Sequence, residues 1–414
     1  MSDTSNPEPV AEPAAADPRS DACVVESSAL GAIVREISWS DALPWWLLFR
    51  AAGTAFSPTV ILLAAFGALA TWAGWSLADR VHLPGLARAT ARADADSAGA
   101  PDGLLLPDAT GGERMLAPSR SALPALVATL DRLPASAADV LRLATVPFQP
   151  TATLGRMVGG LVRIGWFVLV WSIFGTAISR HVALRLIGEE TPGPDGVVWY
   201  GTRKWVSSFN AAAFVLLGML ALAVPGAVLG LLMRTDVGLA LAGAVWPLVL
   251  AGAIVLAILA VGLVAGWPLM VAAVGVERGD SFQAISTAFS YLYQRPLHYA
   301  FYAAIAVLVA VPAFAAAGVF ADATATLAMW AASFGMGHER TSAVIDGVAA
   351  AGVPTVPWGA RAIGFWLRCL HWLLASFGWG YFWAIATAAY LLLRRDVDGT
   401  ELDEVVLEEP GETA

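Results

Sequence analysis

The sequence has few charged residues and almost no cysteine. Charged residues fill 14% of the 414 positions and apolar residues fill 58%, whereas soluble chains average roughly 25% and about 45–50%. A chain with so little polar surface cannot shield its apolar residues from water, so the composition excludes a soluble globular protein. The two cysteines, Cys23 and Cys369, cannot form a disulfide framework. We therefore expect an all-α polytopic membrane protein with two free thiols.

The sequence also lacks the patterns that carry common chemistries. None of the five histidines has a second histidine at zinc-site spacing, and the position that would complete a zinc-peptidase pattern after His338-Glu339 is Ser342. There is no Gly-Lys-Ser phosphate loop and no G-x-S-x-G turn around a serine nucleophile. No basic cluster is interleaved with aromatic residues, as nucleic-acid binding requires. We expect no catalytic site, no cofactor, no metal and no nucleic-acid partner.

Six apolar segments are long enough to cross a bilayer, whose hydrocarbon core of about 30 Å requires about 20 apolar residues in a helix. In the fourth segment Trp246 and Trp267 stand 21 residues apart, which is about 31 Å of helix, and tryptophans at that spacing can lie at both membrane interfaces. The predicted transmembrane domain is 57–393, with outer loops at 79–156 and 321–369. The predicted spans are about 57–78, 157–179, 211–233, 247–274, 298–320 and 370–393.

The two ends of the chain carry much of the acidic charge. The net charge is −9, and many of the acidic residues gather in 1–28 and 394–414, which contain no aromatic residue. Such segments bury too little apolar area to offset the entropy of ordering. We expect both to be disordered acidic tails.

The basic residues between the spans indicate an orientation. Cytoplasmic loops carry an excess of Lys and Arg, and with the N-terminus inside, the outer loop 234–246 holds Arg234 alone. Arginine is far more frequent than lysine, as in proteins from GC-rich bacteria. We expect a protein of the bacterial inner membrane with both termini cytoplasmic. The inner basic residues are Arg35, Arg50, Arg180, Arg185, Arg203, Lys204, Arg278, Arg295, Arg394 and Arg395.

Three segments outside the spans have the pattern of amphipathic helices at a membrane surface. Residues 29–56 mix apolar and charged positions and include Trp45 and Trp46, as an interfacial helix does. The other two segments are linkers in an internal duplication, in which a span, a linker and a span occupy about 157–233 and again about 247–320.

The two linkers predict contacts with lipid. In the first, Arg203 and Lys204 precede Trp205, and in the second, Phe282 and Phe289 lie on one apolar stripe. We predict that these residues lie at the membrane interface or contact lipid, because basic side chains there would meet anionic headgroups. The alternative is that the linkers pack beneath the helix bundle.

The duplication also carries a family resemblance. The segment GWPLMVAAVGVERGDSFQAISTAFSYLYQRP leaves a span through a charged turn and enters a helix rich in Ala and Ser before the next span. In this respect about 157–320 resembles the bacterial multi-pass domains that form the membrane part of some glycerophosphodiester phosphodiesterases, and the Yip1-like membrane domains. The resemblance implies a membrane-embedded helical domain, and it brings no hydrolase domain and no active-site residue to this sequence.

Arg163 is the one ionisable residue predicted inside the core of a span. Intramembrane charges are costly and are candidates for function by default, although an arginine can also extend to the headgroups. We favour a structural role. The spans offer no buried Asp, Glu or His pair of the kind that a proton-coupled carrier uses.

Small residues at helix spacing predict close helix contacts. Gly226 and Gly230 form one small-xxx-small pair, and Gly262 and Gly266 form another. We expect these pairs to pack within the chain, with dimerisation as the alternative.

These patterns favour a non-enzymatic membrane scaffold or interaction protein, whose partners are the lipid bilayer and either other membrane proteins or a second copy of the chain. The alternative is a transporter or channel for a neutral or hydrophobic substrate, with spans kinked at Pro225, Pro247, Pro268 and Pro312. An intramembrane enzyme ranks third, because it would need clustered polar side chains that the sequence does not show.

Overall fold

The computed structural model describes residues 43–81, 140, 153–189, 191–349 and 356–400. The chain divides into two units, 1–46 and 47–414, and the helix contacts given below lie within the second. All elements in the described ranges are α-helices, and six of them are long and apolar enough to cross a membrane. The all-α polytopic fold is thus confirmed. The predicted tail 1–28 and nearly all of the predicted loop 79–156 lie outside the described residues.

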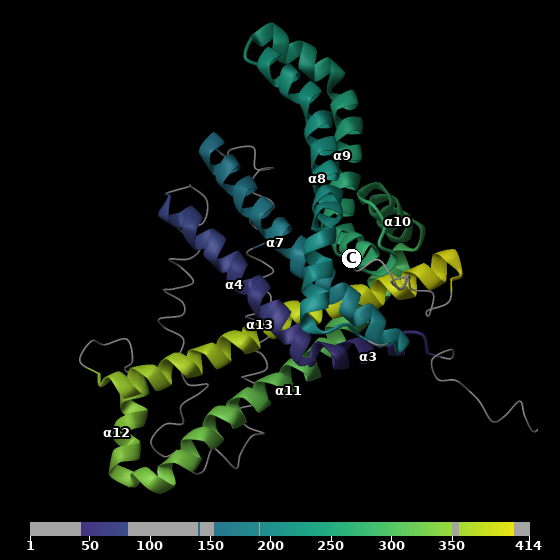
Figure 1. Cartoon of the computed structure of the whole chain (residues 1–414). Helices are drawn as coiled ribbons and strands as arrows, with labels where there is room; N and C mark the ends of the chain where they lie inside the picture. Colours follow the sequence, from purple (N-terminus) through teal and green to yellow (C-terminus); the bar gives the residue numbers. More distant parts are fainter. Residues whose placement is uncertain (1–42, 82–139, 141–152, 190, 350–355, 401–414) are drawn as a thin grey trace, which may run out of the picture. The chain divides into compact units, whose positions relative to one another are not determined.

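The helices follow one another along the chain (Figure 1). They are α3 (Trp46–Ala55), α4 (Pro58–Arg80), α7 (Leu154–Ile187), α8 (Pro194–Leu232), α9 (Asp236–Glu277), α10 (Ser281–Gln294), α11 (Pro296–Met336), α12 (His338–Ala349) and α13 (Trp358–Asp398).

Local sequence signals set the ends of several helices. The Ser57 hydroxyl accepts a hydrogen bond from the backbone N–H of Val60 at 3.4 Å, and Pro58 occupies the first position of α4, as the preferences at helix starts predict. The helices α7 and α13 end at Gly188 and Gly399, with φ of 84° and 68°. Glycine adopts this left-handed conformation without the steric cost of a side chain.

Several helices continue beyond the predicted spans. The predicted outer loop 321–369 is largely helical, because α11 runs to Met336, α12 follows and α13 begins at Trp358. At its other end α13 runs to Asp398, past the predicted start of the tail at 394. Apolarity marks only the part of a helix that crosses lipid, whereas the helix itself ends where the backbone is interrupted.

The two linkers of the duplication have different structures. The first is the start of α8, which continues without a break into the third span, whereas the second is the separate helix α10. The break after α10 falls at Arg295, whose φ and ψ are −129° and 57°. Arg295 precedes Pro296, and the residue before a proline is driven out of the helical conformation. No proline stands at the corresponding place in the first linker.

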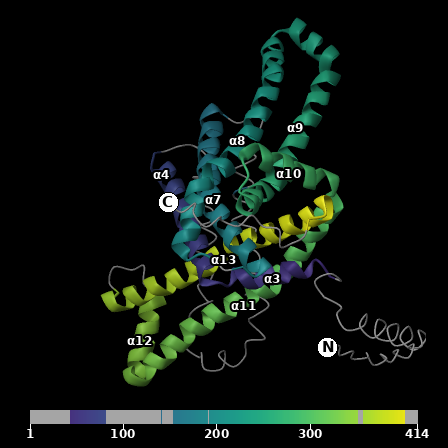
Figure 2. The same ribbon diagram turned by 45° about the vertical axis from the view of Figure 1, so that its right-hand side comes forward.

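The C-terminal half of α13 is surrounded by other helices. Side chains from Ser376 to Leu393 are almost all buried, because α4, α7, α9 and α11 pack against α13. Figure 2 shows how α11, α12 and α13 follow one another, with α12 joining the two long helices.

Aromatic rings fill the contact between α7, α9 and α13. We call Phe167, Trp171, Trp267, Trp379 and Trp383 the tryptophan core. The rings of Trp171 and Trp383 stack with centroids 5.9 Å apart, and Trp267 meets Trp383 edge to face at 5.4 Å. Such pairs add to the free energy of burial. Trp171 and Trp383 are completely buried.

Glycines on neighbouring helices allow these rings to approach the backbone. A Cβ atom added at Gly67 of α4 would lie 3.0 Å from the ring of Trp171, and one added at Gly175 of α7 would lie 2.8 Å from the ring of Trp383. Distances this short leave no space for a larger residue at either position.

The helices α8 and α9 form an antiparallel hairpin that turns near Arg234 (Figure 1). Toward its tip the apolar side chains are mostly exposed, as with Leu248 at 76% and Ile254 at 62%. The two predicted glycine pairs therefore differ in whether they pack against another helix. Gly262 packs against Phe289 of α10, whereas no atom outside the local helix lies within 4 Å of a Cβ placed at Gly226 or Gly230.

Candidate functional site

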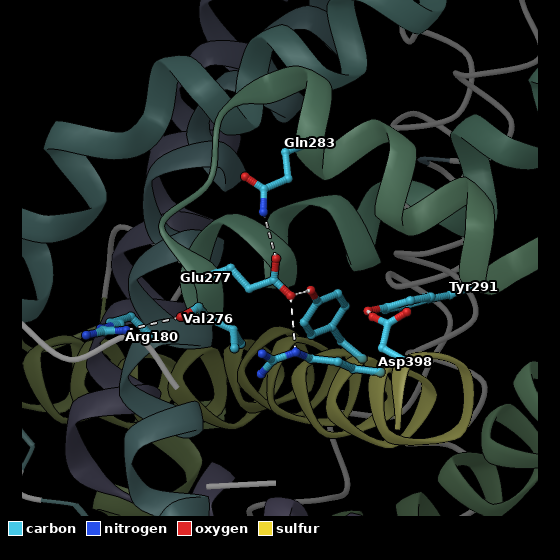
Figure 3. A network of polar contacts seen from close by, with 8 residues as sticks. Arg180, Val276, Glu277, Gln283, Tyr291 and Asp398 are labelled. Carbon is cyan, nitrogen blue, oxygen red and sulfur yellow. Dashed lines mark hydrogen bonds and ion pairs between the residues drawn. The ribbon is translucent and has the colours of Figure 1, made fainter. Parts of the chain in front are cut away.

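A cluster of polar side chains joins the C-terminal ends of α7, α9 and α13 to α10 (Figure 3). We call it the polar cluster. Its members are Arg180, Glu277, Gln283, Tyr291, Tyr390, Arg394 and Asp398. They come from four helices, of which α9 and α10 are consecutive, and the fold brings α7 and α13 to this pair.

Glu277, the last residue of α9, lies at the centre of the polar cluster. Its Oε1 atom accepts a hydrogen bond from the hydroxyl of Tyr390 and forms an ion pair with Nε of Arg394 at 3.3 Å. Its Oε2 atom accepts a hydrogen bond from the side-chain amide of Gln283 at 3.1 Å. Both oxygens of the carboxylate are therefore bound, and the side chain is 15% exposed. Hydrogen bonds to an ionised group are stronger than those between neutral groups.

The last carbonyl groups of α9 are bound by side chains from α7 and α8. The hydroxyl of Tyr200 donates to the carbonyl of Val274 at 2.8 Å, and Nη1 of Arg180 donates to that of Val276 at 3.4 Å. The Val274 carbonyl also accepts the backbone N–H of Arg278 at 3.1 Å, and carbonyls in the last turn of a helix commonly take such additional partners. The positive charge of Arg180 also lies near the negative end of the dipole of α9, which is a stabilising interaction.

The turn after α9 has an unusual backbone. Arg278 has φ of 59°, the one positive value among the described residues other than glycine. The ammonium of Lys204 donates to the carbonyl of Arg278 at 2.7 Å. A left-handed arginine is less stable than a left-handed glycine, and this hydrogen bond from α8 helps to hold it.

Tyrosine–carboxylate hydrogen bonds fix the end of α13. The hydroxyl of Tyr291 on α10 donates to Oδ2 of Asp398, and that of Tyr302 on α11 donates to Oδ2 of Asp396 at 2.7 Å. Burial raises the pKa of Tyr291 above its usual value of 10.0, and the hydrogen bond to Asp398 raises it further. The phenol of Tyr291 therefore stays protonated and acts as a donor.

The arrangement of the polar cluster is suited to holding helix ends together. Its acids face bases or phenols of the same chain. Among the described residues there is no group of three or more His, Cys, Asp or Glu side chains that could hold a metal ion. The charged groups of the polar cluster bind one another.

Arg163 lies in the first half of α7 and forms an ion pair with Asp79 of α4. Its side chain is 1% exposed, and its backbone carbonyl accepts a hydrogen bond from the indole of Trp75 at 3.1 Å. The structure therefore places the predicted intramembrane charge in a contact between two spans. The sequence did not reveal Asp79 as the partner, because we assigned it to the start of a loop.

The predicted interface residues near the chain start and on α9 have different surroundings. Trp46 and Trp246 are exposed, at 49% and 43%, and Trp45 is half-buried. Trp267 is half-buried in the tryptophan core, with its ring 5.7 Å from that of Phe167. The placement of these four tryptophans at a membrane interface stays a prediction.

The predicted lipid-contacting residues of the first linker also differ in their exposure and contacts. Arg203 is exposed and its guanidinium lies over the ring of Trp199, 4.7 Å from the centroid. Lys204 instead points to the backbone after α9. Trp205 is half-buried beside Phe209, with ring centroids 6.1 Å apart.

In the second linker, Phe282 is 67% exposed and stacks on Phe214 of α8, with ring centroids 5.0 Å apart. Phe289 is half-buried against Gly262 of α9. The helix α10 thus packs along α8 and α9, and contact of Phe282 and Phe289 with lipid stays a prediction.

The sequence did not single out Glu277, Tyr390 or the acids at the end of α13 as members of one site. The available signal was that each lies at or near the end of a span on the predicted inner side, beside arginines. Comparisons of this chain with protein-family models, with curated proteins and with solved structures find no match.

Proposed function

We propose that this chain is a non-enzymatic scaffold or interaction protein of the bacterial inner membrane. The observation that carries the proposal is the tryptophan core, in which large rings pack directly on glycines of neighbouring helices. A transporter needs helices that separate during its cycle, whereas rings packed against backbone favour one permanent arrangement. The polar cluster supports the same conclusion, because its charged groups bind one another.

The basic residues support an orientation with both termini in the cytoplasm. Arg180, Lys204 and Arg394 come from three helices and gather around the end of α9. An excess of Lys and Arg is typical of the cytoplasmic side of a membrane protein. This side also holds the ends of α7 and α13, so the chain leaves the last span on the same side as it enters the first.

The α8–α9 hairpin supplies the surface for interactions. Toward its tip most apolar side chains that do not lie between the two helices are exposed, and Gly226 and Gly230 are open to a neighbouring helix. Acyl chains of the bilayer or spans of another membrane protein can cover such a surface.

Cysteine labelling tests whether the interior is closed. In a variant without Cys23 and Cys369, we would place single cysteines at Thr176 and Thr387, which are completely buried, and at the exposed Thr202 as a control. A membrane-impermeant thiol reagent should modify the control from the inner side and should modify neither buried position from either side. Labelling of a buried position would demonstrate an aqueous path and overturn the scaffold in favour of a transporter.

A pull-down from solubilised membranes tests the interaction role. Phe282→Glu places a charge on the exposed face of α10, and deletion of residues 401–414 removes much of the acidic tail. We expect at least one of these changes to reduce the set of co-purified membrane proteins. An unchanged set with both variants would contradict the role of linker and tail as binding surfaces.

The second candidate is a transporter or channel for a neutral or hydrophobic substrate. Prolines lie inside the helices α8, α9 and α11, where each removes a backbone hydrogen bond and can kink the helix. The buried indole N–H groups of Trp171 and Trp383 also have no hydrogen-bond acceptor. Both features favour this candidate if the labelling experiment reveals an aqueous path.

A further inference from the structure

The first turns of α8 present a mixed basic and aromatic face to the surroundings. Trp199, Arg203 and Val206 lie at positions i, i+4 and i+7, so they share one face of the helix. Trp199 and Val206 are each 46% exposed, and Arg203 is exposed as well. The face is therefore accessible along about two helical turns.

The guanidinium of Arg203 contacts an aromatic ring and is not paired with a carboxylate of the described residues. Its Cζ atom lies over the indole ring of Trp199, 4.7 Å from the ring centroid. No carboxylate in the part of the chain that the structure describes forms an ion pair with it. A cation–π contact covers the face of a guanidinium and leaves the N–H groups at its edge able to bind an anion.

The position along α8 matches the headgroup layer of a bilayer. No charged residue occurs between Lys204 and Arg234, and exposed apolar residues begin with Val206 and Phe214. Arg203 precedes Phe214 by 11 residues, or about 16 Å of helix, and each headgroup layer is about 5–7 Å thick. If the hydrocarbon begins between these two residues, Arg203 lies at the level of the lipid phosphates.

We propose that Arg203, supported by Trp199, binds the phosphate of an anionic phospholipid in the leaflet that faces the polar cluster. Arginine binds phosphate through two parallel N–H···O hydrogen bonds. The exposed rings of Phe214 and Phe282, stacked 5.0 Å apart, provide apolar surface further along α8 for an acyl chain. A free phosphate ion would use the charge but would gain nothing from these rings, so the lipid is the ligand that fits both.

The neighbouring base has a different task. Lys204 donates to the carbonyl of Arg278 and so holds the turn between α9 and α10. The two adjacent basic residues of α8 thus allow lipid binding to be separated from stability. This inference goes beyond the scaffold proposal, because an anionic-lipid site is compatible with a scaffold and with a transporter.

Native mass spectrometry of the full chain in detergent tests the site. We would titrate phosphatidylglycerol and phosphatidylcholine and compare the wild type with Arg203→Gln, Lys204→Gln and Arg361→Gln, an exposed arginine at the start of α13. The wild type should prefer phosphatidylglycerol, and Arg203→Gln should weaken its binding about fivefold. Arg361→Gln should keep the preference, and Lys204→Gln should lower the unfolding temperature while keeping the preference.

Two outcomes would overturn the proposal. One is an unchanged phosphatidylglycerol affinity in Arg203→Gln while its unfolding temperature matches the wild type. The other is displacement of bound phosphatidylglycerol by millimolar inorganic phosphate, which would assign the site to a free anion. Trp199→Phe, which keeps an aromatic ring under the guanidinium, should retain most of the affinity, and Trp199→Ala should lose affinity as Arg203→Gln does.

Discussion

The helices α9 and α13 have nearly the same length, 42 and 41 residues, but the most apolar stretch of one is exposed and that of the other is buried. In the most apolar 18-residue stretch of each helix, 6% of the residues are buried in α9 and 89% in α13. The stretch in α9 is nevertheless the more hydrophobic of the two. In water the more apolar segment would lie inside. In a bilayer the acyl chains solvate apolar side chains, so hydrophobicity does not select which helix is surrounded by protein.

The residues of the two helices explain their different places. The buried half of α13 contains Gly380, Thr387 and several Trp and Tyr side chains. These residues allow close helix approach, hydrogen bonding and ring packing. The exposed part of α9 consists mainly of Leu, Val, Ile, Ala and Gly, which gain little from contact with protein when lipid is the alternative.

The largest predicted effect is a difference in unfolding free energy between substitutions of two tryptophans. Trp383 of α13 is completely buried, whereas Trp246 of α9 is 43% exposed. Trp383→Ala should lower the free energy of unfolding by about 3–5 kcal/mol, because it removes a ring from the tryptophan core. Trp246→Ala should lower it by less than about 1 kcal/mol. Chemical unfolding of the purified protein in detergent, followed by circular dichroism, would measure both, and equal losses would refute the contrast.

Two glycines, Gly175 of α7 and Gly252 of α9, differ in the same way in how closely other helices approach them. A Cβ at Gly175 would overlap the ring of Trp383, whereas nothing lies within 4 Å of a Cβ at Gly252 of α9. Gly175→Ala should destabilise the protein by about 1–3 kcal/mol through overpacking. Gly252→Ala should be neutral or should stabilise it by up to about 1 kcal/mol, because alanine favours a helix. Thermal unfolding in the same detergent measures both, and a loss at Gly252 would show that the hairpin is covered.

The two acids at the ends of α9 provide a smaller contrast. Glu277 binds Tyr390, Arg394 and Gln283, whereas Asp236 at the other end is exposed. Glu277→Gln should cost about 1.5 kcal/mol of unfolding free energy, because it removes the charge that Arg394 faces. Asp236→Asn should cost only a few tenths of a kcal/mol through the helix dipole. Denaturant titrations of the two variants decide this, and a larger loss for Asp236→Asn would contradict it.

The smallest effect concerns pH. The pKa of Tyr291 is raised above 10.0 in the folded protein, so the folded state keeps a proton that the unfolded state releases. The stability from this group is complete below pH 10 and decreases as pH rises above it. From pH 9 to pH 10.5 we expect a loss of about 1 kcal/mol or less, and Tyr291→Phe should reduce this loss.

Tyr293→Phe is the matched control for the pH experiment. Tyr293 lies two residues further along α10, is 43% exposed and donates to the backbone carbonyl of Ile258, and no carboxylate among the described residues binds it. It should therefore change the pH dependence less than Tyr291→Phe does. Unfolding titrations at pH 9 and pH 10.5 measure both, and equal effects would show that the Tyr291–Asp398 contact does not fix the end of α13.

Much of the fold follows from the sequence, because each span carries its own signal. Runs of about 20 apolar residues identify a membrane helix without any tertiary contact. Ser57 and Asp280 cap the starts of α4 and α10, and serine and aspartate favour this position in any helix. Apolar length did not predict the helices in 321–349, because it marks the part of a helix that crosses lipid and not where the helix ends.

The candidate site could not be predicted in the same way. Glu277 and Arg394 are 117 residues apart, and nothing in the local pattern of either points to the other. The same holds for Asp79 and Arg163, since an ion pair between two spans depends on which helices are neighbours. The sequence could show that charged residues gather near the inner helix ends, but not how they are paired.

By itself, the sequence determined that the chain is helical and crosses a membrane, because the cost of unpaired backbone groups in lipid applies to each span separately. The tertiary structure decided which apolar stretch is enclosed by other helices and which is left exposed, and it decided that rings pack on Gly67 and Gly175. Those outcomes depend on shape and on pairing between distant segments, and hydrophobicity in a bilayer carries no information about either.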